Sequence, residues 1–212
     1  MMTKQLTIPF VKLSSGDPGT VLELEGARFE VNQVNWPQAF PYAPFCYGRI
    51  GRTEDTLWVD FRVSGLDLRI RNTEDNGRQW EDSCVEIFIA DPSGNGYYNF
   101  EINPLGKVLA CSGASREGRK ARPAGEMAQI IRWPGVAGLS AGEWPGVQAW
   151  RVCVGIPFGL IGLDGKKLPA SIRANFYKCG DKTAHPHFLS WSPVLTPQPD
   201  FHRPEYFGEL LF

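Results

Sequence analysis

The sequence has no apolar run that approaches the ~18 residues a membrane-spanning helix needs. It also has no basic excess, because 22 Lys and Arg residues stand against 23 Asp and Glu residues and the formal net charge is -1. Such a surface does not attract the phosphate backbone of nucleic acid. We therefore expect neither a membrane nor a nucleic acid as the partner.

Paired cysteines are also missing. The five cysteines are an odd number, no Cys-x-x-Cys motif occurs, and the residues concerned are Cys46, Cys84, Cys111, Cys153 and Cys179. This excludes a closed disulfide framework and a zinc ribbon. Residues 1–6 show neither the apolar run nor the cleavage site of a signal peptide. We expect buried, reduced thiols and a cytoplasmic location.

What the chain does contain is strand periodicity and turn residues. The 17 prolines and 23 glycines are scattered along its length, which is typical of many short strands joined by turns. Apolar residues alternate with period two in five segments, which are residues 56–63, 84–89, 97–103, 150–156 and 172–177. Residues 91–96 predict a hairpin turn, 107–111 and 209–212 further strands, 112–125 an exposed loop, and 157–163 the one short helix.

These elements predict the fold class. Closely spaced strands without alternating helices favour an all-β, antiparallel, jelly-roll-like β-sandwich. No linker or internal repeat divides the chain, so we expect a single domain over residues 1–212.

One face of each sheet in a sandwich is left for solvent or for a site. The predicted outward residues carry carboxylate, amide and guanidinium groups, as in Asn99, Glu101, Arg173 and Asn175, with Glu86 beside them. These groups suit the hydroxyls of a sugar, and aromatic rings such as Trp80 and Trp191 suit its apolar face. The alternative is ordinary cross-strand pairing, for example of Glu101 with Arg173.

The segment at residues 80–89, Trp-Glu-Asp-Ser-Cys-Val-Glu-Ile-Phe-Ile, resembles a strand of the family 9-like carbohydrate-binding domains. Residues 97–106, 173–179, 189–193 and 201–208 are similar to later parts of the same family, in the same order. The resemblance implies a non-catalytic module that holds the end of a polysaccharide between two tryptophans. It implies Glu81 as a hydrogen-bonding residue and Trp80 or Trp191 as one of the rings.

Other functions remain open from the residues alone. Glu86 and Glu101 would be the acid pair of a hydrolase or lyase that acts on a sugar derivative. An exposed aromatic patch would instead serve a protein-interaction module. His202 and the three residues after it predict either a polar lip over the site or a buried ion-paired corner that fixes the last strand, and the corner is slightly favoured.

We expect no cofactor and no metal. His185 and His187, with Cys179 and Asp181 nearby, could together offer metal ligands, but a solvated or hydrogen-bonded pair of histidines is the simpler interpretation. Calcium at residues 91–95 is the remaining alternative. That turn has oxygen ligands but lacks the spacing of an EF-hand loop.

Overall fold

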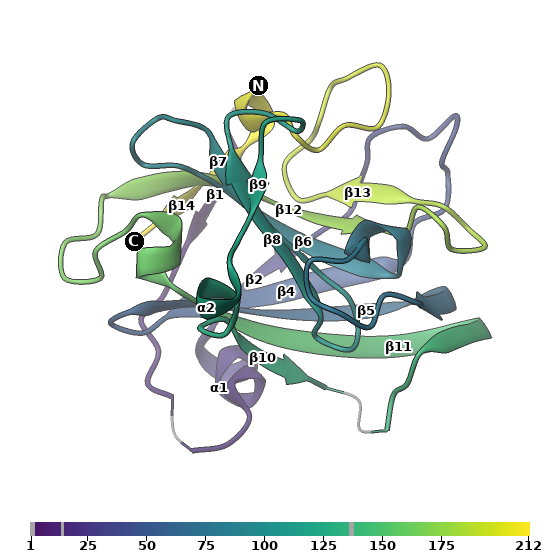
Figure 1. Ribbon diagram of the computed structural model, residues 1–212, viewed down its shortest axis with the longest axis horizontal. Coiled ribbons are helices and arrows are strands. Elements are labelled where there is room, and N and C mark those ends of the chain that lie inside the picture. The colour runs from purple at the N-terminus through teal and green to yellow at the C-terminus, as the bar shows by residue number, and fades with distance from the viewer. Residues whose placement is uncertain (1–2, 14, 136–137) are drawn as a thin grey trace.

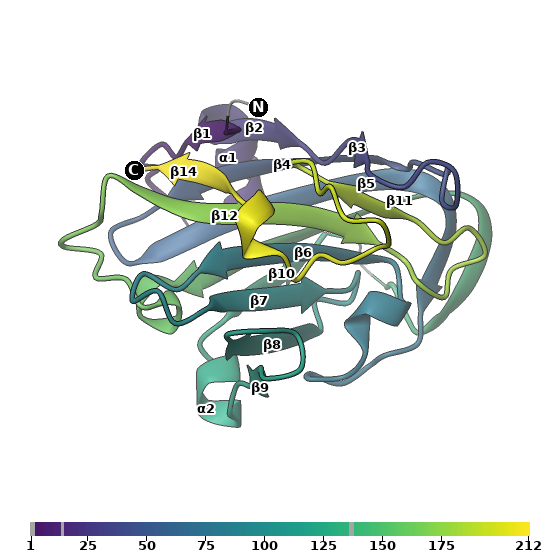
Figure 2. The same cartoon turned by 90° about the horizontal axis from the view of Figure 1, so that it is seen from above.

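A computed structural model describes residues 3–13, 15–135 and 138–212. Its strands form two sheets packed face to face, as Figures 1 and 2 show. The predicted all-β sandwich is confirmed. Met1 and Met2, which begin the segment judged to lack a signal peptide, lie outside the described residues. Among the residues described, no helix is both long and apolar enough to cross a membrane.

The larger sheet is antiparallel except where β1 runs parallel to β14 at one edge. Two short strands extend it, because β13 pairs with β12 and β3 with β13. The order across the sheet is β1 (Gln5–Thr7), β14 (Gly208–Leu211), β12 (Ser171–Cys179), β6 (Cys84–Ala90), β7 (Tyr97–Ile102), β8 (Val108–Gly113) and β9 (Lys120–Ala121), with β13 at Phe188–Ser190 and β3 at Gln33–Val34.

The smaller sheet is antiparallel throughout its described strands. Its order is β10 (Ile131–Pro134), β11 (Gly142–Pro157), β5 (Thr56–Ile70), β4 (Phe45–Arg52) and β2 (Ala27–Glu30). Short helices lie between strands, and they are α1 (Pro18–Glu25), α2 (Ala124–Met127), η1 (Gln79–Glu81), η2 (Phe158–Ile161) and η3 (Pro204–Tyr206).

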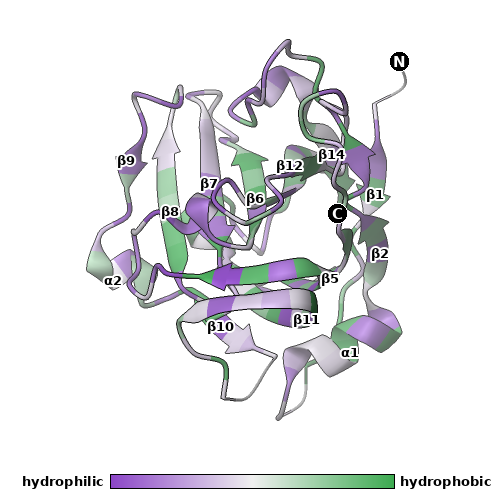
Figure 3. Ribbon diagram, turned by 90° about the vertical axis from the view of Figure 1, so that its right-hand side faces the viewer, coloured by the Kyte–Doolittle hydropathy of each residue, from purple (hydrophilic) through white to green (hydrophobic). Residues whose placement is uncertain are grey.

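The core between the sheets is built from the alternation seen in the sequence. Figure 3 shows hydrophobic and hydrophilic residues alternating along β5, whose residues Leu57, Val59 and Phe61 are buried in the main core. Val85 and Ile87 of β6 enter the same core from the other sheet. The predicted inward faces are therefore confirmed, as is the hairpin at residues 91–96, which the bond from Asp91 N to Gly96 O closes.

On each sheet, a segment that the sequence pattern did not predict packs against part of the outer face. Helix α1 lies on the smaller sheet, where Leu22 packs against Trp58 and Cys153 in a small apolar cluster. On the larger sheet, the chain between β12 and β14 packs on the outer side, and Phe201 stacks on Tyr177 with ring centroids 4.1 Å apart. Of the side chains that we expected on an open face, Glu86, Asn99, Glu101 and Asn175 are buried and Arg173 is exposed.

Two local predictions need correction. Residues 112–125 are not simply an exposed loop, because they contain β9 and lead into α2, and Arg119 among them is half-buried. The helix expected at 157–163 is the 3-10 turn η2, so it is confirmed only as a short helical turn. All five cysteines lie among the described residues and all are free and buried, as predicted.

Candidate functional site

A pocket of about 250 Å³ opens on the outer face of the larger sheet. Its floor consists of Glu86 on β6, Glu101 on β7 and Cys179 at the end of β12. Alternation along each strand sends these side chains away from the core. The register places Glu101 directly opposite Glu86, so the two carboxyl groups are neighbours across the hairpin, as predicted.

The two floor carboxyl groups are almost fully buried, with 3% of Glu86 and 2% of Glu101 exposed. Burial, followed by the neighbouring charge of Glu101, holds the pKa of Glu86 well above its usual range. Burial also raises the pKa of Glu101 to about 7, although Arg119 opposes that change. A raised pKa favours the protonated form of Glu86, and a protonated carboxyl group can donate a hydrogen bond as well as accept one.

The two oxygen atoms of the Glu101 carboxyl group differ in their hydrogen bonding. Its Oε1 accepts hydrogen bonds from Asn99 Nδ2 at 3.0 Å and from Arg119 Nη1 at 3.1 Å. Within the described residues, Glu101 Oε2 and Asn99 Oδ1 are buried without a hydrogen-bond partner. Buried polar atoms are nearly always satisfied, so the floor has unmet hydrogen-bonding capacity.

Aromatic rings form one wall. Trp80 in η1 is half-buried, Phe188 begins β13, and Phe201 follows in the chain toward η3. The rings of Phe188 and Phe201 lie 6.1 Å apart at 67°. This wall offers flat apolar area beside a polar floor, which is the pairing that the two faces of a sugar ring require.

The pocket lining also includes polar side chains, among them Arg119 and His202. Arg119 Nη1 lies 3.3 Å from His202 Nε2, and His202 Nδ1 lies 2.8 Å from the Tyr97 hydroxyl. Because a guanidinium can only donate, Nε2 must accept and Nδ1 carries the hydrogen. Burial and the charge of Arg119 lower the pKa of His202 to about 3, so this imidazole is neutral.

Three of the residues predicted for the site lie at or beside the pocket. Trp80 and Glu101 line it, and Asn99 is fully buried next to Glu101, which it positions. Glu81 follows Trp80, but its carboxylate is bound by Lys182 at 2.9 Å and by Arg78 at 3.4 Å. The Lys182 hydrogen bond is the largest cause of the lowered pKa of Glu81.

The other three predicted residues lie elsewhere. Trp191 is 2% exposed and packs in the main core, where no ligand reaches its ring. Asn175 is buried and clamps the backbone of Ser192, donating to its O at 3.0 Å and accepting from its N at 2.9 Å. Arg173 is exposed and donates to Pro204 O at 2.6 Å.

The suggested cross-strand pair of Glu101 with Arg173 is wrong. Glu101 pairs with Arg119, whereas Arg173 lies on β12 opposite Glu209 of β14. The residues from 202 to 205 do not form the buried ion-paired corner that was slightly favoured. His202 lines the pocket, while Arg203 and Glu205 form a surface ion pair at 2.7 Å.

Sequence reasoning did not assign to the site Phe188 at the start of β13 or the pocket residues that come from loops, which include Arg116, Arg119, Asp181, Asp200 and Phe201. No periodicity marks them. The two histidines of the 185–187 segment contact different partners, since His185 contacts Asp67 and His187 contacts Lys178. In the 91–96 turn, the Asp91 carboxylate accepts a hydrogen bond from Ser93 N at 2.9 Å, so it stabilises the backbone of its own turn.

The fold and pocket define a β-sandwich module that offers a small ligand one aromatic wall and an acidic floor. The chain belongs to carbohydrate-binding family 9, whose model matches residues 20–212. A candidate carbohydrate-binding protein from Bacteroides uniformis has a crystal structure that is similar to this chain at 32% identity, covers 100% of both chains and gives a TM-score of 0.88.

Two more distant structures share the fold alone. Both are of a carbohydrate-binding module of family 9 from Caldicellulosiruptor kristjanssonii. The complex with cellotriose is 11% identical, covers 98% of this chain and 93% of the other, and has a TM-score of 0.61. The complex with glucose is 12% identical, covers 98% and 95%, and has a TM-score of 0.57. No curated protein matches the chain.

Proposed function

We propose that this protein binds a saccharide in the pocket over Glu86 and Glu101 and leaves it chemically unchanged. The observation that carries the proposal is the pairing of a half-buried aromatic wall with a floor that has unmet hydrogen-bonding capacity. Membership of a carbohydrate-binding family supports it.

The pocket dimensions suggest what part of a glycan binds. Pockets for drug-sized ligands measure ~300–1,000 Å³, so a pocket of about 250 Å³ suits one sugar unit and not a long chain. Trp80 would stack on the ring face, and Glu101 Oε2 would accept from a hydroxyl group. The Glu86 carboxyl group would form a hydrogen bond with another sugar oxygen.

The arrangement of the two carboxyl groups argues against hydrolysis. A glycosidase holds its two carboxyl groups on either flank of the bond that it cleaves. Here both carboxyl groups come from adjacent strands on the same sheet face, so they meet a ligand from the same side. A shared floor can bind hydroxyl groups, but it leaves the far side of a sugar without an acid or base.

A glycan array with the purified protein, followed by calorimetric titration of each hit, tests binding. We expect a saccharide hit that is recovered intact after prolonged incubation with the protein. Conversion of the hit to a product would favour the hydrolase or lyase instead. An array without any hit, from a protein that melts cooperatively, would contradict the proposal and favour a protein-interaction module.

A further inference from the structure

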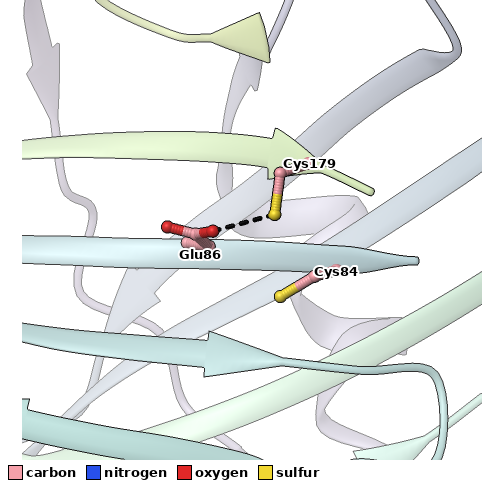
Figure 4. Close-up of side chains that lie close together, drawn as sticks. All are labelled: Cys84, Glu86 and Cys179. Carbon is pink, nitrogen blue, oxygen red and sulfur yellow. Dashed lines mark hydrogen bonds between the residues drawn. The ribbon is translucent and has the colours of Figure 1, made fainter. Parts of the chain in front are cut away.

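A second cluster of reactive side chains lies at the floor of the pocket. Cys84 and Glu86 are two residues apart on β6 and therefore share its outer face, and Cys179 on β12 lies directly opposite Cys84. Their two sulfur atoms and one carboxylate oxygen all lie within 4.8 Å of one another. Figure 4 shows the three side chains gathered between the two strands, with Cys179 Sγ 2.9 Å from Glu86 Oε1.

This spacing is close to that of a metal centre. Zinc binds thiolate sulfur at ~2.3 Å and carboxylate oxygen at ~2.0–2.2 Å, so tetrahedral ligands lie roughly 3.6–3.8 Å apart. Small side-chain rotations would bring the three atoms to those separations. The two strands already fix the backbone positions, so little further ordering is needed to form the site.

The donor set selects the kind of metal. Two sulfur ligands favour a soft or borderline cation such as Zn²⁺, whereas Ca²⁺ and Mg²⁺ prefer oxygen ligands alone. Glu86 and Cys179 both line the pocket, so a fourth coordination position would face the cavity. Three protein ligands with one open position is the arrangement of a zinc site that is accessible to small molecules.

No described cationic side chain forms a hydrogen bond or ion pair with the side chains of the cluster, although Arg116 and Arg119 line the same pocket. Of the described cationic side chains, Arg119 contacts Glu101, the neighbour of Glu86, through that residue's Oε1. Lys178 precedes Cys179 and so lies on the opposite strand face, where its Nζ contacts His187 Nε2 at 2.7 Å. Glu101 Oε2 remains without a partner among the described residues. A bound dication would compensate the negative charge that the carboxyl group and the two thiols acquire when they release their protons.

We propose that Cys84, Glu86 and Cys179 bind one Zn²⁺ ion at the floor of the pocket, with the fourth coordination position open to the cavity. On binding, the two thiols and the carboxyl group each release a proton to solvent. The proposal does not depend on sugar binding, because its test contains no sugar. Failure of one therefore leaves the other standing.

Titration of the reduced, metal-free protein with Cd²⁺ tests the site, because cadmium–thiolate bonds absorb in the ultraviolet. We expect saturation at one equivalent per chain, and competition by Zn²⁺ but not by Ca²⁺ or Mg²⁺. Loss of an outer-shell partner typically costs 10–100-fold in metal affinity, so Cys179→Ser, which removes a ligand, should cost at least about a hundredfold. Cys111→Ser is the matched control, since it removes a buried thiol of the same sheet outside the cluster.

The unmutated chain supplies a second readout that does not depend on the folding of a variant. Zn²⁺ should raise its melting temperature, since a ligand that binds only the native state stabilises it. A wild-type chain with neither a one-equivalent cadmium absorption nor a zinc-dependent rise in melting temperature would overturn the proposal. So would a cadmium signal that survives Cys179→Ser and is lost in Cys111→Ser.

Discussion

The outer faces of the two sheets both bury carboxyl groups, but they treat them differently. On the smaller sheet, Asp60 is fully buried and each of its oxygens has an arginine donor, Arg151 Nε at 2.6 Å and Arg62 Nε at 3.3 Å. Arg151 also binds Asp17, the residue that caps α1. On the larger sheet, Arg119 pairs with Glu101 and not with Glu86, which accepts from Cys179 Sγ, and one oxygen of Glu101 has no partner among the described residues.

The paired acid Asp60 belongs to a structural network, whereas the underpaired acids Glu86 and Glu101 belong to a candidate binding site. Around Asp60 the space is closed, since a Cβ added at Gly19 of α1 would lie 1.5 Å from Arg151 Nη2. Around Glu101 the covering loops leave a pocket. Fully paired buried acids hold α1 on its sheet, whereas underpaired acids beside a cavity cost stability and are free to bind a ligand.

The largest expected effect is a loss of stability when one arginine partner of Asp60 is removed. Arg151→Met should destabilise the fold by about 3–5 kcal/mol, because it leaves the charge of Asp60 buried with only Arg62 as partner. Burial already raises the pKa of Asp60 despite both arginines, so the loss of one is poorly tolerated. Denaturant unfolding measures the change. Arg203→Met, at the surface pair with Glu205, is the control and should leave the unfolding midpoint unchanged.

On the larger sheet, the stability contributed by the Glu101 carboxyl group should fall as pH rises. The pKa of Glu101 is raised from 4.5 to about 7 by folding, so its contribution to stability is complete below pH 4.5 and is lost as pH rises toward 7. Glu101→Gln cannot titrate. In metal-free protein, we expect the variant to gain stability relative to wild type as pH rises from 4.5 to 7.

Chemical denaturation of both proteins at several pH values in the presence of a chelator makes this comparison. A difference in the free energy of unfolding that stays constant over this range would show that Glu101 ionises normally. The proposed difference between the paired acid of the smaller sheet and the underpaired acids of the larger sheet would then have no support from their ionisation.

The pocket wall should affect affinity more than stability. Trp80→Ala removes a half-buried ring that we propose stacks on the sugar, so affinity for the best array hit should fall on the order of tenfold to a hundredfold, or about 1.4–2.8 kcal/mol. Trp133→Ala is the matched control, because this tryptophan is 41% exposed on β10 of the other sheet. Calorimetric titration and melting curves should be recorded for both variants. Equal affinity of the two variants would remove Trp80 from the site.

The smallest effect is expected at Glu81. Its carboxylate already contacts Lys182 and Arg78, so it has less capacity to accept from a sugar than Glu101 has. Glu81→Gln should weaken binding less than Trp80→Ala does, in the same titration. A greater loss with Glu81→Gln would show that the loop holding Lys182 rearranges and that this position contacts the ligand directly.

The parts of the fold and of the candidate site that could be predicted from the sequence are those set by local periodicity. Alternation in residues 84–89 and 97–103 placed Glu86 and Glu101 side by side, because strand period and hairpin register are local properties. The same alternation did not show that the outer face is covered. Arg119, Phe201 and His202 reach the pocket through loops whose paths depend on distant contacts, such as the stacking of Phe201 on Tyr177.

One prediction error had a visible signal in the sequence and another had none. Helix α1 was missed, although Asp17 followed by Pro18 is a good N-cap and first helical residue. Trp191 was taken for a ligand-stacking ring because it is aromatic and lies in a family-like segment. Its position directly after β13 instead sends the ring into the core, where its centroid lies 5.5 Å from that of Phe176. Residue type alone cannot distinguish a buried tryptophan from one in a pocket wall.

A crystal structure of the protein with the best-binding saccharide tests the central claim most directly. The account predicts one sugar unit in the pocket, with its ring against Trp80 and a hydroxyl group within hydrogen-bonding distance of Glu101 Oε2. Arg151 and Asp60 should keep their contacts unchanged beneath α1. A saccharide bound on the smaller sheet, with the pocket over Glu101 filled only by water, would contradict it.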